Sequence, residues 1–154
     1  MQKIAKFEKV SEKQYADQDA ITLPKRATKG SAGYDFYIPN DHPGITLKHN
    51  EFTLIPTGIR CKIDDGWVLM LFPRSGLGFK GLRLYNSTGI IDSDYYFADN
   101  EGHIMAKIVN SGFETITLHG GDRFMQGVFV PYGILEDDDA TEKRSGGIGS
   151  TGTN

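Results

Sequence analysis

The sequence has little cysteine and no pattern of metal-binding histidines. Among its 154 residues Cys61 is the single cysteine, which excludes an internal disulfide and every zinc site built from several thiolates. Four histidines are present, and none stands at a spacing that would pair two ligands on one element: His42, His49, His103 and His119. We therefore predict that Cys61 is a reduced core residue and that any chemistry comes from other side chains.

Long apolar runs and an excess of positive charge are also missing. The chain has no continuous apolar run of the roughly eighteen residues that a membrane helix needs. Its first residues, MQKIAKFEKVSEK, are charged and lack the apolar segment of a signal peptide. The formal net charge of −3 disfavours a duplex-binding surface, so a nucleic-acid connection would concern a free nucleotide and not a polymer. The cytoplasm is the expected compartment.

No window sustains a helical repeat, and short apolar runs stand in its place. Nineteen glycines and six prolines separate these runs, several of which alternate with period two and are rich in β-branched and aromatic residues. A helical turn would fit only at Tyr15–Ala20 and at Gly81–Tyr85. We expect strands at Phe52–Ile55, Ile59–Ile63, Trp67–Phe72, His103–Val109, Thr115–Leu118 and Phe124–Tyr132. Trp67–Phe72 is apolar throughout, as in a strand covered on both faces. The pattern predicts an all-β sandwich or barrel.

The composition indicates one domain followed by an arm. A chain of this length with 38% hydrophobic residues suits a single core. After Tyr132 the sequence becomes acidic at Glu136–Asp139, continues with Lys143-Arg144 and ends in SGGIGSTGTN. We therefore divide the chain into an all-β domain, residues 1–135, and a flexible C-terminal arm, residues 136–154. Taken alone, such a terminus is usually a disordered end.

The segment NSTGIIDSDY, residues 86–95, combines groups that suit a nucleotide site. Asn86 can read the edge of a base, Asp92 can take a proton from water, and Tyr95 can lie flat against a sugar. The same residue types are common in turns. On spacing alone the segment is equally consistent with a solvated hairpin tip and with a site.

Three further segments carry polar groups at the ends of apolar runs. Pro73-Arg74-Ser75-Gly76 offers a guanidinium, a hydroxyl and an accessible backbone amide, which suit a phosphate, although a strand-to-turn junction with an exposed arginine is the plainer alternative. Ala27–Asp35 contains small residues that allow close backbone packing. Gln126 stands among apolar residues, and a buried amide there would need partners.

Taken in order, these segments resemble the five motifs of the homotrimeric dUTP pyrophosphatase (dUTPase) family, which has bacterial and phage-encoded members. The resemblance covers almost the whole chain and implies a jelly-roll-like distorted barrel or sandwich of the β-clip type, in agreement with the periodicity. The matching motifs are SAGYD (Ser31–Asp35), PRSGLG (Pro73–Gly78), GIIDSDY (Gly89–Tyr95), GDRFMQ (Gly121–Gln126) and GGIGSTG (Gly146–Gly152).

The resemblance implies hydrolysis of dUTP to dUMP and pyrophosphate, which limits uracil incorporation into DNA and supplies dUMP for thymidylate synthesis. Asp92 would be the general base. Mg²⁺ would be held by the triphosphate and water with no direct protein ligand, and Asp35 and Gln126 would lie in its outer shell. Substrate contacts are implied for Arg74, Ser75, Gly76, Asn86, Gly89, Ile90, Ile91, Tyr95, Met105, Gln126, Lys143, Arg144, Ile148, Gly149, Ser150 and Thr151.

The resemblance also implies an assembly. It predicts a homotrimer with shared active sites, in which the arm of one chain closes over a pocket formed by the others. The partners would be dUTP and dUMP, with no membrane and no nucleic-acid polymer. Tyr95 against the deoxyribose would leave no room for a 2′-hydroxyl, and the Asn86–Ile91 hairpin would read uracil.

Three positions depart from the family pattern. Ile148 stands where the family has an aromatic residue, Lys143-Arg144 replaces an Arg-Gly pair, and Tyr96–Gly102 lengthens a link that is usually very short. The longer link is either a tolerated surface insertion or a contact for a protein partner, as in a nucleotide-gated regulatory protein. A dCTP deaminase or bifunctional deaminase–dUTPase is the enzymatic alternative, disfavoured because no second arginine follows the Arg74-Ser75 element.

Overall fold

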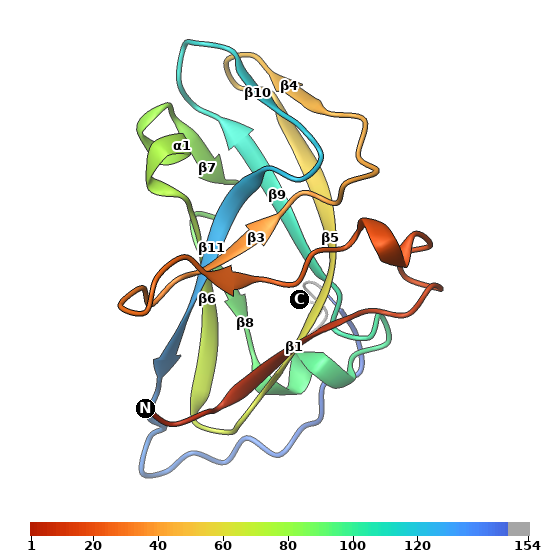
Figure 1. Cartoon of the computed structure of the whole chain (residues 1–154). Helices are drawn as coiled ribbons and strands as arrows, with labels where there is room; N and C mark the ends of the chain where they lie inside the picture. Colours follow the sequence, from red (N-terminus) through yellow and green to blue (C-terminus); the bar gives the residue numbers. More distant parts are fainter. Residues whose placement is uncertain (148–154) are drawn as a thin grey trace.

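The computed structural model describes residues 1–147 and consists mainly of antiparallel strands (Figure 1). Its strands are β1 (Ala5–Lys9), β2 (Lys25–Arg26), β3 (Tyr34–Tyr37), β4 (Ile45–Leu47), β5 (Phe52–Ile63), β6 (Trp67–Pro73), β7 (Leu82–Leu84), β8 (Gly89–Ile91), β9 (Ile104–Asn110), β10 (Ile116–Leu118) and β11 (Arg123–Pro131). Its short helices are η1 (Gln18–Ala20), α1 (Ser75–Phe79) and η2 (Ser93–Phe97).

Two larger sheets enclose one core. The first has the strand order β1-β5-β9-β7 and the second β2-β3-β11-β6-β8, while β10 and β4 form a separate pair. Fully buried side chains come from both sheets, with Ile55 and Ile108 from the first and Phe36, Leu69 and Phe124 from the second. The prediction of an all-β sandwich-like fold is confirmed.

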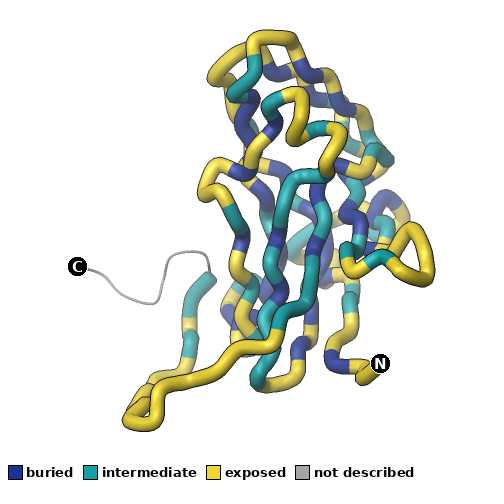
Figure 2. The backbone as a smooth tube through the Cα atoms, turned by 90° about the vertical axis from the view of Figure 1, so that its left-hand side faces the viewer, coloured by how far each residue is buried: buried dark blue, intermediate teal, exposed yellow. Residues whose placement is uncertain are grey.

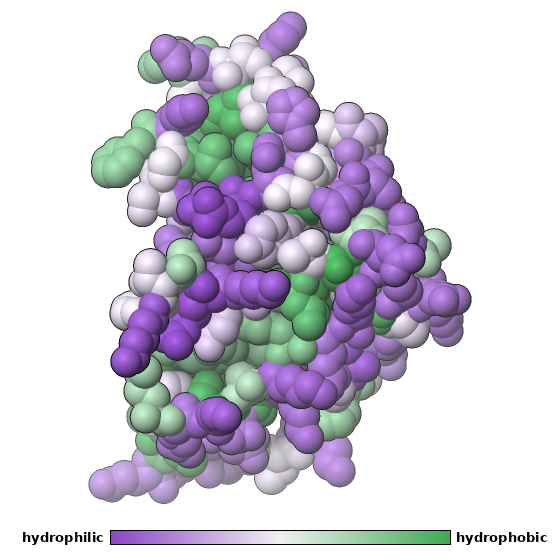
Figure 3. Space-filling view, viewed as in Figure 1, coloured by the Kyte–Doolittle hydropathy of each residue, from purple (hydrophilic) through white to green (hydrophobic). Residues whose placement is uncertain are grey.

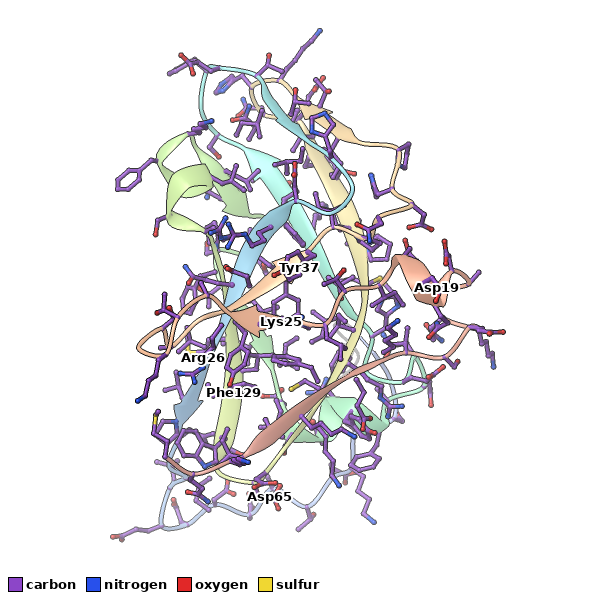
Figure 4. All side chains as sticks on the ribbon, in the orientation of Figure 1. Asp19, Lys25, Arg26, Tyr37, Asp65 and Phe129 are labelled. Carbon is purple, nitrogen blue, oxygen red and sulfur yellow. The ribbon has the colours of Figure 1, made fainter. Side chains whose placement is uncertain are left out.

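Aromatic rings close the core beneath β1. Phe129 of β11 lies 5.8 Å, centroid to centroid, from both Phe7 and Tyr34, and it points toward the space between β1 and β3 (Figure 4). Phe7 also packs edge-on against Phe36. Cys61 has a free thiol and is 1% exposed, and burial raises the pKa of that thiol to about 12, so the prediction of a reduced core cysteine is confirmed.

The predicted apolar runs are strands, with two differences. Phe52–Ile55 and Ile59–Ile63 form one continuous strand, β5, whose pairing with β9 shifts register between Pro56 and Ile59. In β6 only Leu69 and Leu71 are buried, so the expectation of a strand covered on both faces is wrong for a single chain.

The sequence patterns did not predict most of the short helices and strands correctly. Gly81–Tyr85 contains strand β7 and not a helical turn, because Leu82 and Leu84 alternate inward against β9. Tyr15–Ala20 does contain the one-turn helix η1, whose first N–H groups donate to the Asp17 carboxylate. The helices α1 and η2 were not predicted, since five residues are too few to show a period.

The chain leaves the second sheet after β11. The segment that follows is exposed (Figure 2) and runs along the lower edge of the molecule in the view of Figure 1. The Asp99 N–H, just after η2, donates to its Ser145 carbonyl. The division into a domain and an arm stays a prediction. Within residues 1–147, no helix is long and apolar enough to cross a membrane.

Candidate active site

A cavity of about 490 Å³ lies beside β8, between the start of η2 and the middle of β9. The hairpin, the carboxylate and the tyrosine that the sequence singled out all contribute to its wall. Eight of the predicted site residues line it: Asn86, Gly89, Ile90, Ile91, Asp92, Tyr95, Met105 and Arg144.

The hairpin that forms one wall is tightly folded. Ser87 has a positive φ of 69°, and its N–H donates to the Leu84 carbonyl, so the chain reverses directly after β7. Gly89 then pairs with Leu71 of β6, and a Cβ at Gly89 would lie 2.9 Å from the Leu71 Cβ. A glycine is therefore required for the hairpin to lie this close to β6.

Tyr95 forms a rigid wall of the cavity. It is 5% exposed, and its hydroxyl donates to the His103 carbonyl at 2.7 Å while it accepts from Asn100 Nδ2 at 2.9 Å. Burial raises the pKa of the Tyr95 hydroxyl. Because both ends of the side chain are held, the ring has a fixed position against whatever occupies the cavity.

The arm enters this cavity through Arg144. Its Nη2 donates to Asp92 Oδ2 at 2.8 Å and its Nε to Asp94 Oδ1 at 2.9 Å. The guanidinium carbon lies 5.8 Å from the Tyr95 ring centroid, and the Asp99 N–H donates to the Ser145 carbonyl. The resemblance implied an arm that covers a neighbour's pocket, whereas the described part of this arm lies on its own chain.

A second polar cluster lies at the other end of β6. Asp35 is 7% exposed, and its two oxygens accept from Arg74 Nε at 2.9 Å and from Arg123 Nη1 at 3.2 Å. Gln126 faces Asp35 across β3 and β11 and donates to the Pro73 carbonyl. Residues from the first, second and fourth motifs therefore meet.

The two clusters do not share a site within one chain. In the antiparallel pair of β6 and β8, Leu71 faces Gly89 and Leu69 faces Ile91, so Asp92 lies beside Val68. Arg74 follows at the far end of β6, roughly 20 Å away at the rise of an extended strand. Ser75 and Gly76 begin α1 and are exposed there.

Comparison with known proteins decides the family. A dUTPase family model matches residues 19–152. The chain belongs to the dUTPase family. It is 41% identical over 154 residues to a deoxyuridine 5′-triphosphate nucleotidohydrolase of Lactococcus lactis subsp. lactis, covering 97% of this chain and 99% of that one. A protein of the same name from Hahella chejuensis is 44% identical over 140 residues, 86% of this chain and 88% of the relative.

Solved structures agree with this membership. The crystal structure of dUTPase from Streptococcus mutans matches with a TM-score of 0.70 and 39% identity, over 84% of this chain and 98% of that one. The dUTPase from phage phi11 of S. aureus, at 23% identity and a TM-score of 0.69, shares the fold over 91% of this chain and 97% of its own. The predicted family is therefore confirmed.

The Tyr96–Gly102 segment of this dUTPase is packed against the body of the domain. Arg60 donates to the Tyr96 carbonyl at 2.9 Å, and its guanidinium lies 3.6 Å from the Tyr96 ring centroid. The Tyr96 hydroxyl donates to Glu8, and the Glu101 carboxylate accepts from the hydroxyl and the N–H of Ser11. The segment is therefore an integral wall behind Tyr95.

The described residues hold no group of three or more His, Cys, Asp or Glu side chains that would bind a metal directly. The oxygens of Asp35 and Gln126 suit the outer shell of a hydrated ion. Each Asp35 oxygen keeps a second lone pair for water, and Gln126 uses its amide N–H on Pro73, which leaves its carbonyl oxygen to accept. A Cβ at Gly33 would lie 2.4 Å from that oxygen, so glycine makes room for it.

Sequence reasoning missed two cations near the predicted groups. Arg123 lies within the fourth motif, and its place in that motif could have identified it as a site residue. Lys107 lines the cavity, with its Nζ 4.1 Å from the Tyr85 ring and 4.4 Å from the Phe52 ring. It follows Met105 by two residues, so alternation along β9 could have found it. Lys143 is exposed, and Ile148, Gly149, Ser150 and Thr151 lie outside the described residues.

Proposed function

We propose that this chain hydrolyses dUTP to dUMP and pyrophosphate, with Asp92 as the general base. The observation that carries the proposal is the cavity that brings Asn86, Asp92 and Tyr95 together on a hairpin of a dUTPase-family chain. The reaction would limit uracil incorporation into DNA and supply dUMP for thymidylate synthesis. The reduced, buried Cys61 is compatible with the cytoplasm as its compartment.

Asp92 acts on water at the edge of the cavity. Its side chain is half exposed, which allows water to reach the carboxylate. The carboxylate takes a proton as the water oxygen bonds to the α-phosphorus, and the bond from that phosphorus to the pyrophosphate oxygen breaks. Such proton transfer contributes ~10²–10⁴ in rate, and the remainder comes from positioning and charge neutralisation.

The cavity wall supplies the specificity. The Asn86 amide and the backbone of β8 read the uracil edge, so cytosine would leave a buried polar group without its partner. Tyr95 is held through its hydroxyl and presents its ring to the sugar, where a 2′-hydroxyl would not fit. Met105 packs beside the base or sugar.

The triphosphate is bound by a neighbouring chain of a homotrimer. The separation of Arg74 from Asp92 along β6 supports this arrangement, because within residues 1–147 of one chain the Arg74 cluster lies at the far end of β6 from Asp92. The cradle consists of Arg74, Ser75, Gly76 and Gln126, to which we add Arg123. About half of each of Phe52, Leu54, Tyr85 and Ile90 is exposed, and a second copy would cover this apolar surface.

A Mg²⁺ ion bound together with the triphosphate would neutralise part of its negative charge. Asp35 and Gln126 are the residues that would accept hydrogen bonds from its water shell. Lys143 and Arg144 add positive charge from the arm, and we assign substrate contacts to Ile148, Gly149, Ser150 and Thr151. The Tyr96–Gly102 segment stays a candidate surface for a protein partner, and Phe97, 74% exposed, is its accessible apolar residue.

Replacing the base tests the mechanism. Asp92→Asn should lower turnover by ~10²–10⁴ and keep the affinity for a non-hydrolysable dUTP analogue within a few-fold, because the amide keeps its shape and cannot take the proton. Pyrophosphate release is measured with dUTP, dCTP, UTP and dTTP, with and without Mg²⁺. Asp99→Asn, an exposed neighbour outside the cavity, is the control. Wild-type-like turnover of Asp92→Asn would exclude this mechanism, and ammonia release would indicate the deaminase.

A further inference from the structure

We propose that Asn100 is a positioning residue that fixes the Tyr95 ring and thereby sets the selectivity of the site for deoxyribose over ribose. The proposal rests on the proposed function, since it takes the Tyr95 ring as the wall against the sugar. Asn100 does not line the cavity. It lies in the Tyr96–Gly102 segment, between η2 and β9, and its Nδ2 donates to the Tyr95 hydroxyl at 2.9 Å.

The Asn100 amide serves two groups, one on each side. Its Oδ1 accepts from the Gly102 N–H at 3.2 Å, so Nδ2 is the atom that faces Tyr95. The turn needs only an acceptor at this position, which an aspartate or a serine would supply as well. Asparagine adds an N–H donor that is directed at the Tyr95 oxygen. The residue type therefore fits the tyrosine contact and not the turn alone.

Two hydrogen bonds from different directions hold the Tyr95 hydroxyl. It donates to the His103 carbonyl at 2.7 Å, and this bond alone would let the ring tilt about it. The Asn100 N–H binds the same oxygen from a second direction and removes that freedom. Both partners lie between η2 and β9, and the His103 N–H donates to the Asn100 carbonyl at 3.1 Å, which fixes the two partners relative to each other. The link therefore holds the ring from behind.

The ring excludes a 2′-hydroxyl only while it stays against the sugar. Loss of the Asn100 donor would let the ring retreat, which admits ribose more than it harms deoxyribose. The ratio of kcat/KM for dUTP to kcat/KM for UTP should fall about three- to tenfold, the range that one neutral hydrogen bond allows. Asp92 keeps its place in the reaction, so kcat for dUTP should stay within about twofold.

Asn100→Asp tests the donor alone. The carboxylate has nearly the same shape and still accepts from the Gly102 N–H, but it offers no N–H to Tyr95. Because dUTP and UTP carry the same charge, the added negative charge affects both and cancels from the ratio. Asn50→Asp is the matched control: Asn50 is exposed, does not line this cavity and makes no side-chain hydrogen bond within residues 1–147. It should leave the ratio unchanged.

A double-mutant cycle shows whether Asn100 acts through Tyr95. Tyr95→Phe keeps the ring and lacks the hydroxyl. Asn100→Asp should therefore lower the selectivity ratio in the wild-type background and change it by less than about twofold in the Tyr95→Phe background. A general disturbance of the segment would lower the ratio equally in both backgrounds. Calorimetric binding of dUMP and UMP gives the same comparison without turnover.

The outcomes separate this inference from the proposed function. A wild type that selects dUMP over UMP and does not hydrolyse dUTP would contradict the proposed function and leave the test of Asn100 intact. A selective wild type whose Asn100→Asp variant keeps the ratio would overturn the role of Asn100 alone, and so would an equal loss in both backgrounds. Asn100→Ala also removes the contact with Gly102. A loss of selectivity in that variant only would assign the effect to the turn and overturn the role of the donor.

Discussion

His103 is a buried titratable side chain held in its neutral form. It is 1% exposed, and its Nε2 accepts from the Gly58 N–H at 2.9 Å, so the ring proton sits on Nδ1, which has no partner within residues 1–147. Burial lowers the pKa of His103, opposed by the Glu101 charge. The Tyr15 ring covers its edge. Protonation of Nε2 would bring two N–H groups against each other.

The stability of the chain should therefore fall as the pH decreases through the ordinary histidine pKa of about 6.5. The unfolded chain binds the His103 proton before the folded chain does, so unfolding is favoured below that pH and the stability is regained above it. Thermal unfolding between pH 7.5 and 5.5 measures the effect. His103→Gln should flatten this dependence, whereas His119→Asn, which alters an exposed ring, should preserve it. An equal slope in wild type and His103→Gln would contradict the assignment.

At the scale of elements, the 3₁₀ helix η2 and the turn after it position the cavity wall. The turn reaches Gly102, whose φ is +70° and whose added Cβ would lie 2.6 Å from the Tyr95 carbonyl and 2.8 Å from the Tyr96 Cα. Both of these atoms belong to the backbone, so neither can rotate away. Side-chain contacts to β1 and β5 hold the other side of the segment. The position of Tyr95 therefore depends on a turn outside the cavity.

Gly102→Ala should destabilise the fold by about 1–3 kcal/mol and raise the KM for dUTP, because the left-handed backbone is strained and η2 must shift. Gly66→Ala is a matched control: its φ is +81°, and an added Cβ there meets nothing within 4 Å. Gly66→Ala should show backbone strain alone. Its free energy of unfolding should fall by about 1 kcal/mol, and its KM for dUTP should not change. Denaturant unfolding and steady-state kinetics give both quantities. If the two glycines respond alike, the turn does not position Tyr95.

The sequence predicted the elements whose information is local. Alternation and turn residues revealed five of the eleven strands within residues 1–147, namely β5, β6, β9, β10 and β11. The motif around Asp92 predicted the groups that meet in the cavity. The contact of Arg144 with Asp92 joins residues 52 positions apart. It depends on the path of an exposed arm, which the periodicity of the sequence cannot predict. The ion pairs of Asp35 with Arg74 and Arg123 likewise depend on how the strands align, including the register between β3 and β11. Helix α1 has five residues, which are too few for helix propensity to predict it.

At the scale of the whole molecule, the surface of one chain carries features of an incomplete assembly. The face in Figure 3 shows apolar patches between hydrophilic ones, and several large apolar side chains that line or flank the cavity are about half exposed. Asp92, the proposed base, and the Arg74 cluster lie at opposite ends of β6. In the proposed homotrimer, a closed ring of three chains would bring the Arg74 end of one chain to the Asp92 end of the next.

Mixed assemblies test this arrangement directly. Two inactive variants, Arg74→Ala and Asp92→Asn, are co-expressed with different tags and purified as mixed trimers. A site is complete when its Asp92 comes from the first variant and its Arg74 from the second, so each mixed trimer should carry about one complete site in three. The control pair, Arg74→Ala with Gln126→Ala, damages the same side of the interface and should restore none, because no chain then supplies an intact phosphate cluster. No recovery in the first pair would show that each site is built within one chain, and recovery in the control pair would contradict the assignment of Arg74 and Gln126 to one phosphate cluster.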